Sequence, residues 1–260
     1  MSFLHRFFFT RPKLRRAVTR LLEGEREVEV SLLGAKLRVH SVKEHGYLRS
    51  SRLAKNSALF RDEAPVLLNL AALLADGDTF VDIGANVGIY SLTLARMRAL
   101  LPKTKFYAFE ANPDTFSRLA AHAREMGVVA HNIALSDHEG TLQFVAGAVS
   151  HVFTTVDNAT SYSLAGETSA VPCKRLDQFD IAGDSLILKI DVEGQEKAVL
   201  DGASQFFVKK RVKAVYLDGC KEQAAVEDFL RGHGFAFLEG RTLAPTQGGV
   251  FSLLALRPEK

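Results

Sequence analysis

The sequence contains no tryptophan, very little cysteine and no long apolar run near its N-terminus. Two cysteines, Cys173 and Cys220, cannot build a disulfide framework, and no CxxC pair suggests a metal site, so the composition predicts a reducing, cytoplasmic compartment. The apolar run Phe7–Phe9 is too short for a secretory signal or a membrane-spanning helix. What is present is an ordinary globular mixture of 260 residues, 47% hydrophobic and 24% charged, which can bury a large core unaided.

The formal net charge of +3 conceals a basic N-terminal segment and a slightly acidic remainder. A faintly acidic body argues against nucleic acid as a partner, because phosphate binding depends on clustered Lys and Arg. The basic segment could lie peripherally on an anionic membrane surface, contact a partner, or form a docked terminal helix. Residues 1–20 contain no acid, the remaining chain has 27 basic and 30 acidic residues, and the basic residues of the segment are Arg6, Arg11, Lys13, Arg15, Arg16 and Arg20.

From residue 77 onward, short apolar strand patterns alternate with helical patterns of 10–15 residues. This alternation predicts an α/β fold with a mostly parallel sheet and helices on both faces. The third strand of this sheet is expected over residues 128–135. Residues 138–184 interrupt the alternation, with two added strands at 141–146 and 170–176. Between them, the Ser/Thr-rich stretch 147–169 lacks periodicity and is typical of a functional lid or a mobile loop.

The segment before this domain has a different pattern. Residues 25–40 alternate apolar and polar side chains around Gly34, which predicts a β-hairpin. A polar stretch follows, and a helix is expected to start at Asp62. We therefore expect three parts: a basic N-terminal lead (1–24), a hairpin and helix extension (25–76), and a main domain (77–260) that carries the insertion.

A glycine-containing loop, VDIGANVG at 81–88, links a buried strand to a helix. Gly84 lets the chain turn sharply off the strand, and Gly88 lets the helix pack closely on the sheet. Asn86 stands where similar loops often have another glycine, and asparagine tolerates the left-handed conformation. Backbone amides at the start of the following helix form a slightly positive cradle for a ligand. An ordinary βα turn is the alternative.

Two acids indicate which ligand such a loop would bind. Asp82 precedes the turn, where a carboxylate suits a cationic ligand better than a pyrophosphate, and the spacing is not the G-x-G-x-x-G of nicotinamide sites. Glu110 ends the second strand, where an acid can bind both hydroxyls of a ribose, unless it is a surface residue. A ribose combined with a positive charge describes S-adenosylmethionine.

VDIGANVG is one of five segments that resemble the FkbM family of S-adenosylmethionine-dependent methyltransferases. The others, in chain order, are FEANPDTFSRL at 109–119, NIALSD at 132–137, VPCKRLDQF at 171–179 and LKIDVEGQE at 188–196. The resemblance implies a Rossmann-like class I methyltransferase fold, with a seven-stranded sheet whose last strand is antiparallel. It also implies methyl transfer to a hydroxyl oxygen, often on a sugar or another small molecule. Ala111, in place of proline, and Asp218, in place of glutamate, depart from the family pattern.

Further candidate residues stand at the ends of the expected strands, where doubly wound sheets bind ligands. Asp82 and Gly84 should face the methionine part of the cofactor and Glu110 its ribose. Ala134, Ser136 and Asp137 follow the third strand and could border the adenine, although Asp137 fits a turn equally well.

The segment KIDVEGQE supplies the candidates for catalysis, because a sugar hydroxyl is barely acidic and its proton needs a base or a metal. Asp191 and Glu193, two residues apart on an extended segment, can converge on one acceptor, with Asp191 as base or acceptor-orienting group and Glu193 in support. Lys189 is expected to form a structural ion pair. Glu196 is expected to be a first-turn residue of the next helix or an exposed charge.

Alternatives for the proton-accepting group remain open. Asp191 and Asp218 could together hold one Mg²⁺ through their oxygens, unless Asp218 only caps a helix. A histidine is a further option, and the candidates near the expected site are His131, His138 and His151.

Three functions compete on this sequence. The leading hypothesis is an S-adenosylmethionine-dependent O-methyltransferase that acts on a small-molecule or glycan hydroxyl. A nicotinamide-dependent oxidoreductase would share the architecture, but Asp82 and the missing G-x-G-x-x-G oppose it. A non-catalytic binding subunit with a methyltransferase fold is the third, and the intact Asp191 position opposes it.

Overall fold

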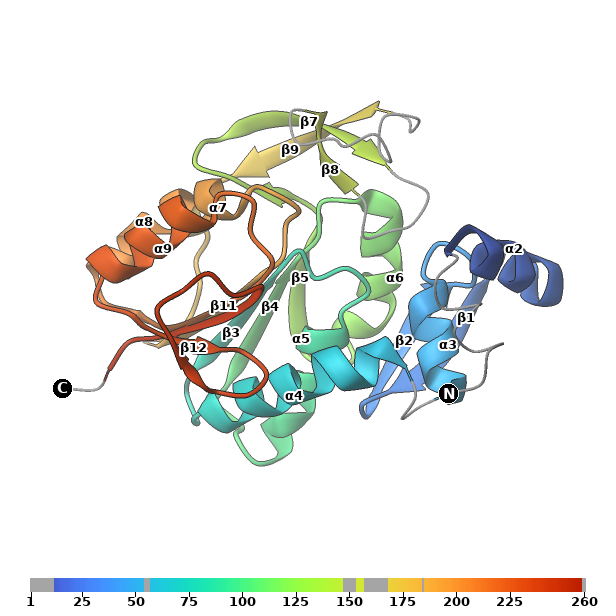
Figure 1. Ribbon diagram of the computed structural model, residues 1–260, viewed down its shortest axis with the longest axis horizontal. Helices are drawn as coiled ribbons and strands as arrows, with labels where there is room; N and C mark the ends of the chain where they lie inside the picture. The colour runs from blue at the N-terminus through green and yellow to red at the C-terminus, as the bar shows by residue number, and fades with distance from the viewer. Residues whose placement is uncertain (1–11, 54–56, 147–152, 157–167, 184, 259–260) are drawn as a thin grey trace.

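The computed structural model describes residues 12–53, 57–146, 153–156, 168–183 and 185–258. In this part of the chain, the main sheet has eight strands in the order β13-β12-β14-β11-β10-β3-β4-β5, and its centre is visible in Figure 1. Its strands are β3 (Thr79–Ile83), β4 (Lys105–Phe109), β5 (Val128–His131), β10 (Leu186–Ile190), β11 (Val212–Asp218), β12 (Ala236–Glu239), β13 (Pro245–Thr246) and β14 (Ser252–Leu256).

The strand directions agree with the class I methyltransferase topology implied by the sequence. Strands β3, β4, β5, β10 and β11 are parallel, whereas β14 is antiparallel to β11 and to β12. The two-residue strand β13 adds an eighth strand beyond the seven expected. The strand order reverses between β3 and β10, so the carboxyl ends of these two strands flank the switch point where such sheets bind ligands.

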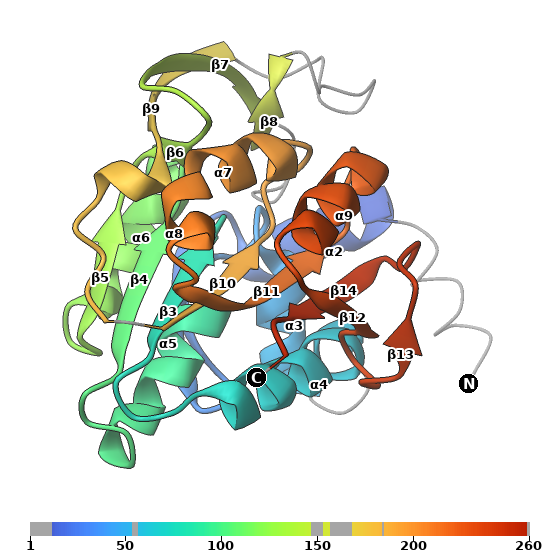
Figure 2. The same ribbon diagram turned by 90° about the vertical axis from the view of Figure 1, so that its left-hand side faces the viewer.

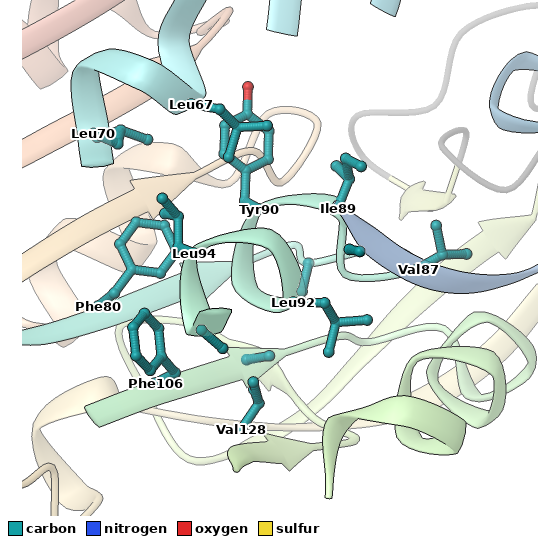
Figure 3. Packing of buried hydrophobic residues seen from close by; sticks show 14 of the residues in the cluster. Leu67, Leu70, Phe80, Val87, Ile89, Tyr90, Leu92, Leu94, Phe106 and Val128 are labelled. Carbon is teal, nitrogen blue, oxygen red and sulfur yellow. The ribbon is translucent and has the colours of Figure 1, made fainter. Parts of the chain in front are cut away.

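Helices cover both faces of the sheet, as expected from the alternating pattern. One face packs against α4 (Ala58–Leu73), α5 (Ile89–Ala95) and α6 (Pro113–Ala123), and Figure 3 shows its apolar core around Phe80 and Leu92. The other face packs against α7 (Glu196–Gly202), α8 (Ser204–Val208) and α9 (Gln223–Gly232), which are seen best in Figure 2.

Strands β3 and β10 lie side by side at the centre and are buried along their whole length. Their sequences, TFVDI and LILKI, are nearly continuous apolar runs, as is typical of strands covered on both faces. Each run contains one charged residue, and these two, Asp82 and Lys189, are direct partners in the strand register. The opposite charges therefore enter the core together.

The insertion forms a second, four-stranded sheet in the described residues, with the order β6-β9-β7-β8. It lies above the carboxyl edge of the main sheet in Figure 1. The two added strands expected from the sequence are β7 (Gly140–Ala146) and β9 (Thr168–Lys174), which pair antiparallel. Strand β8 (Phe153–Thr155) falls in the stretch expected to lack regular structure. The rest of that stretch before Thr168, apart from Val156, lies outside the described residues, as does His151.

The single strand expected at 128–135 is wrong. The chain leaves the main sheet after His131, and β6 (Ala134–Leu135) pairs instead with β9 of the second sheet. Asn132 causes the break, because its side-chain amide donates hydrogen bonds to the carbonyls of Glu110 (2.8 Å) and Ala111 (3.2 Å). The residues that follow the third strand are thereby turned toward the insertion.

The N-terminal region contains the expected hairpin, formed by β1 (Glu27–Leu32) and β2 (Ala35–His40). Leu33 and Gly34 both have positive φ angles, 48° and 85°, as a two-residue hairpin turn requires. Helix α2 (Pro12–Glu23) precedes the hairpin, and residues 1–11 lie outside the described residues. In the described part of the chain, no helix has the length and apolar character needed to cross a membrane.

The following segment differs from its sequence pattern in two ways. The polar stretch contains a helix, α3 (His45–Leu53), that its composition does not predict. Helix α4 begins at Ala58 rather than at Asp62, because Ser57 caps it by accepting a hydrogen bond from the Phe60 amide, so that Pro65 lies inside the helix. With the added turn, Glu63 lies in the second turn of the helix rather than at its start.

The extension shares its core with the main domain instead of packing separately. Apolar residues of the hairpin, including Leu37 and Val39, belong to the same buried cluster as Leu92 of α5 and Leu119 of α6. A buried ion pair reinforces this contact: Arg118 of α6 donates to the carboxylate of Glu44 over 2.6 Å, and their side chains are 5% and 0% exposed.

We expect the Arg118→Ala substitution to destabilise the protein by about 3–5 kcal/mol, because it leaves the carboxylate of Glu44 buried without its cation. Lys43→Ala is the matched control. Lys43 pairs with Asp114 at the surface, with 48% and 68% exposed side chains, and its loss should cost about 0–1 kcal/mol. Urea unfolding of the two variants measures the difference. Equal stabilities would contradict the assigned role of the buried pair.

Candidate active site

The loop after β3 lies directly against the loop after β10. Gly84 has a φ angle of 73°, and a Cβ atom built on it would lie 1.8 Å from the carbonyl oxygen of Asp191. No residue other than glycine fits there. Asn86 adopts the left-handed conformation with φ of 51°, and Gly88, with φ of 87°, caps α5 where a Cβ would meet Leu119 at 2.5 Å. The backbone requirements inferred for these three positions are therefore met.

Glu110 follows β4 and fixes this loop. One of its carboxylate oxygens accepts a hydrogen bond from the Asn86 amide and the other from the Asn112 amide, both at 2.8 Å. Burial raises the pKa of Glu110 to about 7, and the two backbone amides and Lys189 oppose that rise. Glu110 is 8% exposed, so it is not the surface residue of the alternative interpretation.

A cleft opens where these loops meet the second sheet. Six of the ten sequence-predicted site residues line it: Gly84, Asn86, Glu110, Ala134, Asp191 and Glu193. The other lining residues are mostly apolar and were not identified from the sequence: Ile83, Phe109, Ala111, Ile133, Leu135, Phe144, Val192 and Gln195. Three carboxylates, and no Lys or Arg, line the cleft in the described part of the chain.

Asp82 lies beneath the loop and does not line the cleft. Its side chain is 0% exposed, and one oxygen accepts a hydrogen bond from the Ser91 amide of α5 at 3.0 Å. The other oxygen is 3.5 Å from Nζ of Lys189. Burial raises the pKa of Asp82, although Lys189 and Ser91 counteract this. The sequence places Asp82 against the methionine part of a ligand, whereas the structure places it under the loop that would hold that ligand.

Lys189 connects Asp82, beneath the glycine loop, to Asp191, one of the two catalytic candidates. Its ammonium is 3.1 Å from the Gly84 carbonyl and 3.4 Å from Oδ2 of Asp191, in addition to its contact with Asp82. Burial alone would lower the pKa of Lys189, but the surrounding carboxylates, led by Asp191 and Asp82, reverse the effect and raise it. The ion pair expected for Lys189 is confirmed, and it links the two loops.

Asp191 and Glu193, the two catalytic candidates, both line the cleft. Asp191 is 38% exposed. Glu193 has a φ angle of 53°. Loss of solvent around Glu193 raises its pKa to about 7, with Asp191 and Glu196 adding to the rise. Glu193 can therefore accept a proton near neutral pH.

The second sheet bonds to the segment that carries Glu193. Thr154 of β8 donates a hydrogen bond to the Glu193 carbonyl at 2.9 Å, and the Gln195 side chain donates to the Thr155 hydroxyl at 3.2 Å. Glu196 is in the first turn of α7 as expected, but it is buried rather than exposed, and its carboxylate accepts the Gly194 amide at 2.8 Å. No pattern in the sequence identifies β8 as a support for the site.

Ser136 and Asp137 do not line the cleft. Ser136 is buried, and its amide donates to the Lys174 carbonyl of β9 at 3.0 Å. Asp137 is bound instead by its neighbour His138 at 2.7 Å, and Arg175 donates to its carbonyl at 2.8 Å. These contacts fit the turn that the sequence also allows for Asp137.

The described residues include the candidates for a magnesium site and two of the three candidate histidines, His131 and His138. Within the described ranges, no group of three or more His, Cys, Asp or Glu side chains is arranged to hold a metal ion. Asp218 accepts a hydrogen bond from the Tyr216 hydroxyl at 3.1 Å. His131 stacks on Phe109, with ring centroids 5.0 Å apart, and His138 is engaged by Asp137.

Comparison with known proteins places the chain among methyltransferases. The family model of the Methyltransferase FkbM domain matches residues 82–237. The Hexuronic acid methyltransferase AglP of Haloferax volcanii is 29% identical over an alignment of 184 residues. The alignment covers 67% of this chain and 66% of that protein, slightly under two thirds of its length.

Two solved structures are also similar. The precorrin-6Y C5,15-methyltransferase of Geobacter metallireducens has a TM-score of 0.41 and 15% identity, over 79% of this chain and 92% of that one. A TehB-like SAM-dependent methyltransferase of Corynebacterium glutamicum has a TM-score of 0.44 and 12% identity, over 84% and 99% of the two chains.

We expect Lys189→Met to destabilise the protein by about 3–5 kcal/mol at neutral pH, because it leaves the carboxylate of Asp82 buried without its cation. Without the ammonium, the raised pKa of Asp82 in the folded state rises further above its unfolded value. The stability deficit should therefore shrink as the pH falls from 8 to 5 and Asp82 becomes protonated.

The control is Lys197→Met, which removes a partly exposed pair with Asp201 on α7 and should cost about 0.5 kcal/mol at any of these pH values. Unfolding free energies at several pH values provide the measurement. A pH-independent deficit in Lys189→Met would show that Asp82 is not the group left uncompensated.

Proposed function

Because the chain belongs to the FkbM methyltransferase family, we propose that it is an S-adenosylmethionine-dependent O-methyltransferase that acts on a hydroxyl of a small-molecule or glycan acceptor. The observation that carries this proposal is the cleft itself. It brings the glycine loop and Glu110 together with Asp191 and Glu193 in one cavity. A donor-binding side and a proton-accepting side thus face the same space.

The described residues fit the cofactor. Gly84 leaves room that any Cβ would fill, and Glu110 presents a buried carboxylate beside the loop. Apolar side chains such as Ile133 and Leu135 offer a surface for an adenine ring. Bound S-adenosylmethionine supplies a methyl group already activated by a sulfonium. The carboxylates lining the cleft suit this positive charge, and no described cation there opposes it.

The chain's own residues then need to align the acceptor, exclude water and take up its proton. One carboxylate oxygen of Asp191 can accept a hydrogen bond from the acceptor hydroxyl, while Lys189 binds the other oxygen, Oδ2. Glu193, whose pKa is about 7, can share or pass on the proton as the new carbon–oxygen bond forms. The electron pair of the breaking carbon–sulfur bond stays on sulfur, so the transfer requires no oxidant.

The charge of the cleft favours a hydroxyl over a carboxylate as the accepting group. A uronic acid carries both, and the relative in Haloferax volcanii is described as a hexuronic acid methyltransferase. A carboxylate acceptor needs no base but would meet Asp191 and Glu193 without a lining cation in the described residues. Lys189 is 3% exposed and already has three oxygen partners, so it is not free to bind an acceptor.

The test is a transfer assay with labelled methyl groups on neutral sugars, uronic acids and their reduced forms. Calorimetric titration with S-adenosylmethionine, S-adenosylhomocysteine and NAD accompanies it. Binding of the first two without NAD, and label on a hydroxyl, would support the proposal. Binding of NAD alone would favour the oxidoreductase alternative. Label recovered as a base-labile ester would shift the acceptor to the carboxylate.

We expect Asp191→Asn to lower kcat by about 10²-fold or more, the range for a lost general base, while the affinity for S-adenosylmethionine changes little. Asp228→Asn on α9 is the control, because Asp228 is 78% exposed and pairs only with Arg231 among the described residues. Single-turnover rates and calorimetry measure the two effects. Full activity of Asp191→Asn would remove Asp191 from catalysis and reopen the binding-subunit alternative.

We also propose a cytoplasmic position with peripheral membrane contact through the basic N-terminal segment. In α2, Leu21 and Leu22 are 84% and 74% exposed next to Arg20. The protein should co-sediment with vesicles of anionic but not zwitterionic lipid, and replacing both leucines by serine should abolish this. Leu100→Ser, at a leucine that is 79% exposed after the 3₁₀ turn Arg96–Ala99, is the control. Absence of binding to anionic vesicles would end this proposal.

A further inference from the structure

A carboxylate from outside the family match lies near the candidate active site, where it interacts electrostatically with Lys189 and Asp191 without lining the cleft. Glu63 lies on α4 of the extension, 19 residues before the matched segment begins at residue 82. The hydroxyl of Tyr90, in the first turn of α5, donates a hydrogen bond to it. Figure 3 shows Tyr90 on α5 next to Leu67 of α4. The extension is thereby connected to the helix that follows the glycine loop.

Tyr90 links Glu63 to the centre of the site. Its ring lies over the ammonium of Lys189, with 5.2 Å between Nζ and the ring centroid. Lys189 in turn contacts the Gly84 carbonyl and Asp191. Glu63 is therefore one aromatic side chain away from the cation that joins the cofactor loop to the catalytic candidate.

Charged and titratable groups face Glu63 from every element packed around it. They are Tyr90 on α5, Lys189 and Asp191 at the end of β10, Asp218 at the end of β11 and Tyr47 on α3. Burial raises the pKa of Glu63 to about 7, with Asp218 and Asp191 adding to the rise, whereas the Tyr90 hydrogen bond and Lys189 lower it. With Glu63, this cluster has three carboxylates, the other two being Asp191 and Asp218, and one ammonium, that of Lys189.

We propose that Glu63 is a positioning residue that sets the charge of the methyl-transfer site, so that the positively charged donor binds in preference to its neutral product. This inference rests on the proposed function. Transfer converts a sulfonium into a thioether and so removes one positive charge. Since the acceptor is to be held at Asp191, the sulfonium has to approach Asp191, and the negative charge around Asp191 then acts on it. A higher relative affinity for the donor also favours replacement of bound product by a new donor molecule at equilibrium.

The experiment compares the binding of S-adenosylmethionine and S-adenosylhomocysteine to the full chain by calorimetry. Glu63→Gln keeps the shape and an acceptor for Tyr90 but removes the charge. It should weaken donor binding at pH 8 by about fivefold, the size of one screened charge interaction, and leave product binding unchanged. Asp62→Asn is the matched control: it removes one charge from the same helix, where Asp62 pairs with Arg61 and Arg241, and should alter neither affinity.

The pH dependence separates a charge effect from a structural one. In the wild type, the preference for the donor over the product should increase between pH 6 and 8 as Glu63 ionises. In Glu63→Gln, only the part of this increase that is due to Glu110 and Glu193 should remain. Tyr90→Phe removes the hydrogen bond that stabilises the ionised form, which raises the pKa of Glu63. In Tyr90→Phe, the preference for the donor over the product should therefore develop at a higher pH than in the wild type.

Equal weakening of donor and product in Glu63→Gln, or no change in either, would overturn the inference, as would an unshifted profile in Tyr90→Phe. These readouts do not depend on knowing the acceptor. If the wild type binds both ligands but methylates no hydroxyl, the proposed acceptor fails while the donor preference still decides the role of Glu63. If the wild type binds neither ligand, both proposals fail together.

Discussion

A single buried ammonium organises the centre of this protein. Lys189 sits in the middle of an apolar strand, paired in register with Asp82 on the neighbouring strand, and the desolvation of either charge alone would be prohibitive. The pair is stable only because further oxygens surround the ammonium, namely the Gly84 carbonyl and the carboxylate of Asp191. Those two groups belong to the two loops that frame the cleft. Satisfying one buried charge therefore fixes the relative position of the loop after β3 and the loop after β10.

The sequence predicts the sheet and much of the cleft because both depend on local patterns. The strand–helix alternation predicts the mostly parallel sheet, and the resemblance to the FkbM family implies its antiparallel last strand. Gly84 and Asn86 could be assigned because their backbone conformations restrict the residue type. Glu110 and Asp191 could be placed because they follow buried strands, whose carboxyl ends meet at one edge of the sheet.

What the sequence does not predict depends on contacts between distant segments. Asp82 precedes the loop as a ligand-facing acid would, yet its partner 107 residues later draws it into the core. The third strand ends early because the Asn132 side chain bonds to another loop, an interaction that no periodicity encodes. Glu63 was not recognised since its relevance arises from Tyr90, and the helix that carries it starts one turn earlier than its sequence signal.

Strand β8 of the insertion has a consequence for the exchange of segments between related proteins. It contributes Thr154 and Thr155, which bond to residues 193 and 195 after β10. Surface insertions usually tolerate change because they rest on a rigid scaffold, but this one also bonds to the segment that carries Glu193. Grafting the insertion from a homologue would transmit any shift of its edge strand to Glu193. Substitutions that leave β8 in place should therefore disturb the cleft less than replacement of the whole insertion.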